Sequence, residues 1–251
     1  MSLPVHLVAS LDGVAVGSAV EVTGDEAHHA VAVRRLRVGE EVVLTDGVGH
    51  RVVGSVSSTG KRVFSVAVTS ASFIERPAPT FTVVQALPKG DRGELAVEVL
   101  TEIGVDTIVP WAASRSVAVW KGERATRSQA KWQATAREAG KQSRRCWLPS
   151  VTALSSTPEV VARLSGAALV AVLHEDATAP LASLDVPSEG EIVVVVGPEG
   201  GIAPDELAAF EAAGAVTVRL GDEVLRTSTA GLAAVSALLA RTARWGASPR
   251  P

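Results

Sequence analysis

Two loops in the last third of the chain carry residue types suited to ligand binding and catalysis. The first, residues 197–201, has the sequence Gly-Pro-Glu-Gly-Gly and follows a wholly apolar stretch at 192–196. Its three glycines allow backbone N–H and C=O groups to approach a ligand, because no Cβ atom intervenes. A plain turn between a strand and a helix is the alternative interpretation of these residues.

The second loop, residues 220–230, has the sequence Leu-Gly-Asp-Glu-Val-Leu-Arg-Thr-Ser-Thr-Ala. Thr227 and Ser228 can cap the helix that we expect to follow, which is a structural role. Arg226 stands at the same helix start, where the positive end of the helix dipole disfavours a cation. We therefore expect an anion or a carboxylate close to Arg226.

Both loops lie between a predicted strand and a predicted helix. From residue 81 onward, apolar stretches typical of strands alternate with segments of helical periodicity. The predicted strands are 81–87, 105–109, 167–173, 192–196 and 216–220, and the predicted helices include 91–103, 127–147, 204–213 and 227–244. This alternation predicts an α/β domain with a mostly parallel sheet. Ligands of such sheets bind beyond the carboxyl ends of the strands, where both loops would lie.

The first 72 residues have a different pattern. Short β-branched segments at 41–45, 51–56 and 62–68 are separated by turn sequences, which predicts a small antiparallel barrel with one short helix at 25–33. A linker that contains Pro77 and Pro79 follows. We therefore expect two domains, 1–74 and 78–251.

Several familiar sites are absent from the sequence. It contains neither a P-loop nor a Rossmann glycine fingerprint, and no Gly-x-Ser-x-Gly elbow. None of the five histidines is spaced from cysteine or acidic residues as metal ligands are, so no metal site is expected. The single cysteine, Cys146, excludes an internal disulfide and is interpreted as structural.

Composition and charge narrow the class of protein further. A hydrophobic content of 47% with no secretory signal or membrane-spanning stretch predicts a soluble, cytoplasmic protein without membrane association. The formal net charge is −3, yet residues 114–147 hold nine basic and two acidic side chains, a net charge of +7. Such a segment is suited to phosphate binding, and a solvated helix face is the alternative.

The two loops together, at this spacing, resemble the last two motifs of the SPOUT methyltransferases, and in particular the RsmE family, which methylates N3 of a uridine in 16S ribosomal RNA. Three further stretches carry the resemblance over nearly the whole chain. They are His29 with Arg34-Arg35-Leu36; Lys89-Gly90 with residues 101–105; and Trp132 with Glu138-Ala139, Gln142-Ser143 and Arg145. The resemblance implies a PUA-like RNA-binding barrel, a trefoil-knotted catalytic domain, S-adenosylmethionine as methyl donor, a homodimer, and 16S rRNA or the small ribosomal subunit as partner.

The resemblance also assigns residues. The donor would be held through Leu173, His174, Gly197, Pro198, Glu199, Gly200, Gly201, Leu220, Gly221, Val224 and Leu225. Arg226 would act electrostatically, with Glu199 or water as proton acceptor; a structural role for Glu199, pairing with Arg226 or capping the next helix, is the alternative. Phosphate contacts are predicted for Arg34, Arg35, Arg37, Lys89, Arg115, Lys131, Arg137, Lys141, Arg144 and Arg145, of which the last five are expected on the long helix.

The sequence departs from the family pattern next to both loops. Ala203 replaces a usual serine, so the helix after residues 197–201 (the glycine loop) is expected to lack its side-chain cap. The expected loss of helix stability is about 1 kcal/mol. Ser228 replaces a common glutamate, which weakens any assignment of a general base there. Three alternative functions stay open: a catalytically silent RNA-binding protein, a SPOUT enzyme for another RNA position, and an enzyme for a small phosphorylated metabolite.

Overall fold

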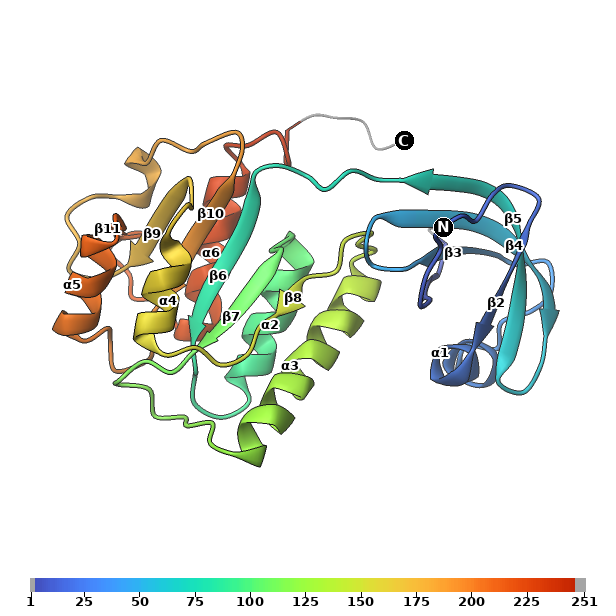
Figure 1. Cartoon of the computed structure of the whole chain (residues 1–251), viewed down its shortest axis with the longest axis horizontal. Coiled ribbons are helices and arrows are strands. Elements are labelled where there is room, and N and C mark those ends of the chain that lie inside the picture. Colours follow the sequence, from blue (N-terminus) through green and yellow to red (C-terminus); the bar gives the residue numbers. More distant parts are fainter. Residues whose placement is uncertain (1–2, 247–251) are drawn as a thin grey trace. The chain divides into compact units, whose positions relative to one another are not determined.

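The computed structural model describes residues 3–246, and the contacts between residues divide the chain into two units (Figure 1). The first unit consists of Met1–Arg76 and Lys141–Leu148, and the second of Pro77–Gly140 and Pro149–Pro251. A short internal segment thus packs with the N-terminal residues, which the sequence patterns do not indicate.

The first unit is built on a five-stranded sheet with the order β1-β3-β4-β5-β2. Its strands are β1 (Val5–Leu7), β2 (Ala19–Thr23), β3 (Glu41–Thr45), β4 (His50–Thr59) and β5 (Val63–Phe73). All neighbours pair antiparallel except β1 and β3, which are parallel. Alternate residues of these strands, among them Leu44 and Phe64, form one buried core. The strand-rich architecture predicted for this unit is therefore confirmed, whereas the fully antiparallel pairing is not, because β1 and β3 run parallel.

The helix predicted at 25–33 is also present. It begins as α1 (Gly24–His28) and continues as a π-helical turn, His29–Val33. Arg34 follows directly, and Arg35 has a left-handed backbone with φ of 57°.

A buried ion-pair network connects α1 with the segment Lys141–Leu148. Nδ1 of His6 lies 3.2 Å from Oε1 of Glu26, and Nζ of Lys141 lies 2.8 Å from Oε2 of Glu26. The side chains of Glu26 and Lys141 are only 9% and 13% exposed. Burial by itself would raise the pKa of Glu26, but hydrogen bonds from His6 and Lys141 and the charge of Lys141 outweigh it and lower the pKa to about 2.

This network makes the stability of the first unit depend on pH. Because the pKa of Glu26 is lower in the folded than in the unfolded chain, its stabilisation is present above about pH 4.5 and lost as the pH falls towards 2. The expected loss is on the order of 3 kcal/mol in the free energy of unfolding. Urea unfolding measured from pH 6 to pH 2 should show it, and Glu26→Gln should flatten the dependence. The matched control Glu21→Gln, at an exposed position of β2, should leave it unchanged; equal slopes for both variants would contradict the assignment.

The second unit contains a six-stranded, fully parallel sheet with the order β11-β9-β10-β6-β7-β8. Its strands are β6 (Thr80–Ala86), β7 (Thr107–Trp111), β8 (Ser150–Val151), β9 (Leu169–Leu173), β10 (Glu191–Val196) and β11 (Val216–Val218). Its helices are α2 (Arg92–Ile103), α3 (Glu123–Gln142), α4 (Thr157–Leu164), α5 (Pro204–Ala212) and α6 (Thr227–Leu239), with a 3-10 turn at Leu181–Ser183. The predicted α/β domain with a parallel sheet is confirmed.

Each face of this sheet is covered by its own helices (Figure 1). One core joins side chains of α2, α3 and α6 to the sheet, for example Leu100, Trp132 and Leu238. The other core joins α4 and α5 to the opposite face and includes Phe210. Because residues 192–196 are buried on both faces, β10 is wholly apolar apart from its first residue.

Some boundaries differ from the sequence-based expectation. Gly104 ends α2 with φ of 108°, as its position predicts. The helix expected over 127–147 instead begins at Glu123 and ends at Gln142, so Arg144 and Arg145 do not lie on it. The physical reason is the backbone of Arg144, whose left-handed φ of 59° cannot continue a right-handed helix.

The connection between β9 and β10 crosses the C-terminal segment. The backbone N–H of Arg219 donates to the carbonyl of Ala179, and the N–H of Leu181 donates to the carbonyl of Arg219. Further on, the guanidinium of Arg241 donates to the carbonyls of Ala182 and Leu184. After the edge strand β11, the chain thus runs past the β9–β10 connection, and α6 then packs on strands β6 and β10. The expected knotted topology requires this path.

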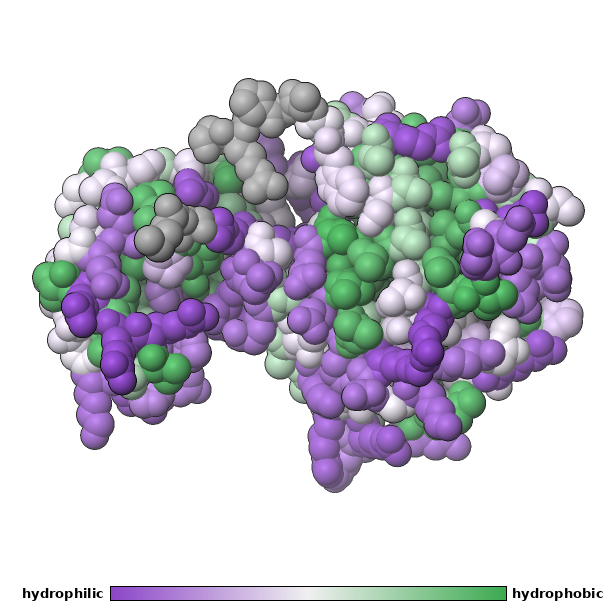
Figure 2. Space-filling model, turned by 180° about the vertical axis from the view of Figure 1, so that it is seen from behind, coloured by the Kyte–Doolittle hydropathy of each residue, from purple (hydrophilic) through white to green (hydrophobic). Residues whose placement is uncertain are grey.

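Surface hydropathy is uneven on the second unit. Seen from behind, it carries hydrophobic areas surrounded by hydrophilic residues (Figure 2). Exposed apolar side chains of this unit include Leu95 of α2 and Val224 and Leu225 of the loop before α6. Among residues 3–246, no helix has both the length and the hydrophobicity that crossing a membrane requires.

Candidate functional site

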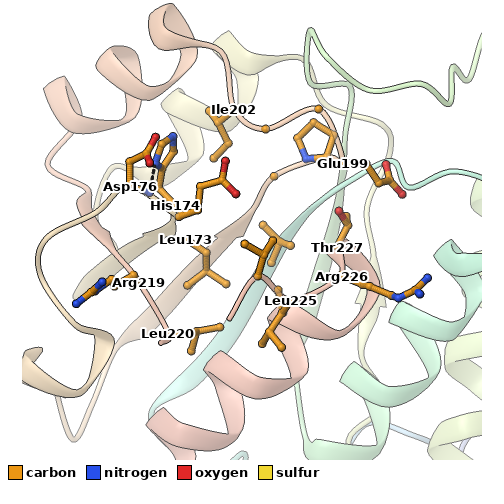
Figure 3. Close-up of a pocket in the computed structure, with 18 of the residues that line it drawn as sticks. Leu173, His174, Asp176, Glu199, Ile202, Arg219, Leu220, Leu225, Arg226 and Thr227 are labelled. Carbon is orange, nitrogen blue, oxygen red and sulfur yellow. Dashed lines mark hydrogen bonds between the residues drawn. The ribbon is translucent and has the colours of Figure 1, made fainter. Parts of the chain in front are cut away.

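A cleft of about 790 Å³ opens at the carboxyl ends of β9, β10 and β11 (Figure 3). Three segments form most of its wall: residues 173–176 after β9, 196–202 after β10, and 219–227 after β11. Arg92, Arg115 and Ala230 complete the lining. Every residue that the sequence assigns to donor binding lies in its wall, and so does Arg226. The parallel topology brings the two loops together, because neighbouring parallel strands present their carboxyl ends at one edge of the sheet.

The glycine loop lines the cleft with its backbone, and at its three glycines no side chain separates the backbone from a ligand. A Cβ atom on Gly200 would lie 3.0 Å from the carbonyl oxygen of Arg115, and one on Gly197 would lie 2.7 Å from Cγ1 of Ile202. Gly201 has φ of +73°, and its N–H donates to the carbonyl of Pro198 to close the turn. Glycine is therefore required here by close approach and by backbone conformation.

The loop after β11 offers both apolar surface and main-chain donors. The side chains of Leu173, Leu220 and Leu225 lie together in the cleft (Figure 3). Within the part of the chain that the structure describes, the backbone N–H groups of residues 221–225 have no hydrogen-bond acceptor. The two loops therefore present an apolar wall beside free main-chain donors, a combination suited to a nucleoside.

The rim of the cleft carries charge of both signs. Glu175, Asp176, Asp222 and Glu223 lie in its wall, and Arg219 pairs with Asp222 at 3.2 Å. The backbone N–H of Asp176 donates to Nδ1 of His174 and so orients the imidazole ring (Figure 3). Arg92, Arg115 and Arg226 also line the cleft, so it presents charges of both signs to a ligand.

Arg226 and Glu199 stand at the same end of the cleft (Figure 3). Arg226 is the N-cap residue of α6 and is exposed, and no carboxylate among residues 3–246 lies within 4.0 Å of its guanidinium. The carboxylate partner expected for Arg226 is therefore not found. Glu199 instead accepts a hydrogen bond of 3.0 Å from the backbone N–H of Lys89 through Oε1. Glu199 thus neither pairs with Arg226 nor caps α5.

Two buried polar residues that support the cleft were not foreseen from the sequence. Gln85 of β6 is fully buried, and its Nε2 donates to the carbonyl of Thr227 at 3.3 Å, which fixes the start of α6. The sequence feature that could have indicated Gln85 is a single amide side chain near the end of a mostly apolar strand. Glu206 of α5 is 4% exposed and accepts four hydrogen bonds. Their donors are the N–H and hydroxyl of Ser114, the hydroxyl of Thr157 and the N–H of Ala203.

Glu206 also corrects one expectation about α5. Ala203 offers no side-chain cap, as predicted, but the Glu206 carboxylate accepts the Ala203 N–H, which satisfies one of the free donors at that helix start. The predicted cost of an uncapped end is therefore partly offset.

The basic residues expected to contact RNA lie in different surroundings. The first unit exposes Arg34, Arg35 and Arg37. In the second unit, Lys89 is exposed after β6 and Arg115 lines the cleft. Lys131 and Lys141 are held in ion pairs of 2.8 Å with Glu94 and Glu26. Arg137 lies on α3, whereas Arg144 and Arg145 follow its end. At 13% exposure and in an ion pair, Lys141 is poorly placed to contact a phosphate.

Comparison with protein families identifies both units. The model of an RNA methyltransferase domain matches residues 75–239, and the model of an RNA methyltransferase PUA domain matches residues 22–68. The first of these matches covers well over half of the chain. PUA-like and catalytic parts therefore occur together here, in the order that the sequence suggests.

Individual relatives agree with these models. A protein of Mycobacterium bovis named ribosomal RNA small subunit methyltransferase E is 46% identical over 236 residues, which are 92% of this chain and 90% of the relative. Its namesake in Bacillus subtilis is 30% identical over 88% of this chain and 90% of its own length. The crystal structure of the Neisseria gonorrhoeae methyltransferase E bound to S-adenosylmethionine superimposes with a TM-score of 0.86, at 27% identity, over 96% of this chain and 98% of that one. The chain therefore belongs to the ribosomal RNA small subunit methyltransferase E family, the RsmE family.

Proposed function

We propose that this protein transfers a methyl group from S-adenosylmethionine to N3 of a uridine in 16S rRNA of the small ribosomal subunit. The observation that carries the proposal is the single cleft formed by the two loops of the second unit, in a chain of this family. Residues 1–74 are proposed to hold RNA, together with residues 141–148 that pack with them, and the rest of residues 78–251 to carry out the reaction.

The cleft fits the methyl donor by its chemistry. The apolar wall of Leu173, Leu220 and Leu225 would face the adenine ring, and main-chain groups of residues 197–201 and 221–225 would bind its polar edge and the ribose. When bound, the donor supplies a methyl group on a positively charged sulfur.

Arg226 and Glu199 are proposed to prepare the uridine. N3 of uracil carries a proton and becomes a good nucleophile only when that proton is lost. The Arg226 guanidinium, free of a carboxylate partner among the described residues, would stabilise the negative charge that develops on the base. Oε1 of Glu199 is held by the Lys89 N–H, whereas Oε2 has no partner among residues 3–246, so Oε2 would accept the proton, directly or through water.

The remaining proposals concern assembly and location. The exposed apolar side chain of Leu95 and the hydrophobic areas of the second unit support a homodimer (Figure 2). Because the proposed substrate is part of the small ribosomal subunit, we propose a cytoplasmic location. Among residues 3–246, no group of three or more His, Cys, Asp or Glu side chains is arranged to hold a metal ion.

Binding of RNA should depend steeply on salt through the exposed arginines of the first unit. Each phosphate contact removed lowers the slope of log affinity against log salt by roughly 0.7–0.9. We therefore expect the Arg34→Ala and Arg37→Ala double variant to reduce that slope by about 1.4–1.8, measured with small subunits between 50 and 300 mM KCl. The control Arg62→Ala, which removes an exposed arginine of the same unit that is paired with Asp25, should leave the slope unchanged. A slope that is the same in wild type and double variant would contradict RNA binding through these residues.

The function itself is tested by nucleoside mapping. Purified protein is incubated with small subunits from a strain that lacks the gene and with S-adenosylmethionine that carries an isotopically labelled methyl group. The 16S rRNA is then digested and analysed by mass spectrometry. Label in a single N3-methyluridine is the expected result. Label at another nucleotide would favour a SPOUT enzyme of different specificity, and RNA binding without label would favour a silent RNA-binding protein; either would overturn the proposal.

A further inference from the structure

The first unit contains a second cavity, far smaller than the donor cleft. It has a volume of about 220 Å³ and lies between the loop after β1, the start of β4 and the end of β5. Leu11, Val14, Val52 and Ala71 give it apolar walls, and His50 and Phe73 add an imidazole and a benzene ring. The antiparallel register pairs His50 with Phe73 and Val52 with Ala71, so these four side chains share one face of the sheet.

His50 is held in one orientation by Asp46. Nδ1 of His50 lies 2.7 Å from Oδ2 of Asp46, whose side chain is 1% exposed and also accepts the backbone N–H groups of Leu11, Val48 and His50. Burial would raise the pKa of Asp46, but these hydrogen bonds outweigh it and lower the pKa. An ionised Asp46 therefore fixes the proton on Nδ1. Nε2 is then left for other partners, on a side chain that is 30% exposed.

Phe73 is an aromatic ring presented to solvent on a rigid support. It is 50% exposed, and its ring meets His50 edge to face at 5.0 Å and Trp147 at 6.0 Å. Gly49 makes this arrangement possible, because a Cβ atom there would lie 2.8 Å from Phe73 and 2.7 Å from Trp147. The guanidinium of Arg76 lies over the Trp147 ring at 5.7 Å, which adds a cation next to the aromatic pair.

We propose that this cavity, formed by His50, Phe73 and the apolar residues around them, binds one unpaired nucleobase of the RNA substrate. Planar bases bind in proteins by stacking on exposed aromatic rings, with their edges hydrogen-bonded to fixed polar groups. Phe73 supplies the ring, and Nε2 of His50, on an imidazole that Asp46 holds in place, supplies a polar atom for a hydrogen bond to the edge of the base. The exposed Arg34, Arg35 and Arg37 of the same unit supply cations for the phosphates. The inference rests on the proposed function only in taking RNA as the substrate.

Removing the stacking ring tests the proposal. We expect Phe73→Ala to weaken the affinity of the full chain for small subunits by roughly 5- to 150-fold, the range found when a base-stacking aromatic is replaced by alanine. Phe73→Trp should restore affinity. Because no phosphate contact is lost, the salt slope of Phe73→Ala should equal that of wild type, whereas Arg37→Ala should lower it. Val16→Ala, which removes another exposed apolar side chain of this unit that does not line the cavity, serves as the control and should bind as wild type does.

A second measurement identifies the ligand group. With only five histidines in the chain, ring signals of ¹⁵N-labelled histidine can be followed during titration with uridine, cytidine, adenosine and guanosine monophosphates. The His50 ring signal should shift with at least one nucleotide and should not shift with ribose 5-phosphate. Equal shifts with ribose 5-phosphate would mean that the cavity holds phosphate and would overturn the proposal.

Failure of this inference and failure of the proposed function are distinguishable. If Phe73→Ala binds small subunits as tightly as wild type while wild type still methylates them, the base-binding cavity is refuted and the enzymatic function stands. Phe73 lies outside the donor cleft, so donor affinity and the turnover rate at saturating RNA should not change in this variant. Loss of turnover at saturating RNA would show that Phe73 acts in the reaction itself and would overturn the binding role.

Discussion

Replacing Arg226 with alanine is expected to lower the rate of methyl transfer by about 10²- to 10³-fold, while the affinity for S-adenosylmethionine changes by no more than a few-fold. Arg226 is exposed at the end of the cleft and has no carboxylate partner among the described residues, so its charge is available to the uridine. Its loss should therefore affect the transition state and not the donor. Single-turnover kinetics with small subunits and calorimetric titration with the donor measure the two quantities separately.

Arg219 offers a matched control for this prediction. It lines the same cleft, but its guanidinium is paired with Asp222. Arg219→Ala should therefore leave the rate of the chemical step within about ten-fold of wild type. An equal loss of donor affinity and rate in Arg226→Ala would reject the electrostatic role, and so would equal effects of the two arginine variants.

Replacing Glu206 with alanine is expected to lower the free energy of unfolding of the second unit by roughly 3 kcal/mol or more. The buried carboxylate accepts four hydrogen bonds, and hydrogen bonds to charged groups each contribute about 1.5–3 kcal/mol before compensation. The variant leaves the N–H of the buried residue Ala203, and both donors of Ser114, without this acceptor. Because Ala203 lies two residues after Gly201, the donor site should also become less ordered. Urea unfolding followed by tryptophan fluorescence measures the loss.

The control for Glu206 lies on the same helix turn. Asp205 is exposed and contributes only its favourable interaction with the helix dipole, so Asp205→Ala should cost no more than about 1 kcal/mol. If Glu206→Ala proves no less stable than Asp205→Ala, the carboxylate does not hold these segments together. Donor affinity that stays unchanged in a destabilised Glu206→Ala would show that the glycine loop keeps its form without this support.

The parallel sheet and the positions of the two loops could be predicted from local pattern alone. Residues 192–196 are continuously apolar because β10 is covered on both faces, and glycines mark the points where backbone must approach closely or turn. Periodicity and caps are properties of neighbouring residues, so α2 with its terminal Gly104 was expected almost where it lies. These short-range signals also place both loops at one edge of the sheet.

Features that depend on distant partners could not be predicted. The end of α3 is set by the left-handed backbone of Arg144 and by the packing of Lys141–Leu148 with the first unit. Glu206 gathers donors from residues 92 and 49 positions away, and nothing in its sequence surroundings indicates them. The contact of Glu199 with the Lys89 backbone likewise spans 110 residues. Long-range hydrogen bonds leave little trace in local composition, so they become visible only in the folded chain.

Hydrogen–deuterium exchange with and without S-adenosylmethionine tests most directly whether the two loops hold the donor through main-chain atoms. Saturating donor should slow exchange of backbone amides in residues 197–203 and 220–226 and leave peptides of the first unit unchanged. Protection arises because these N–H groups become hydrogen-bonded or shielded from water. Protection confined to other segments, or no change at saturating donor, would contradict the account.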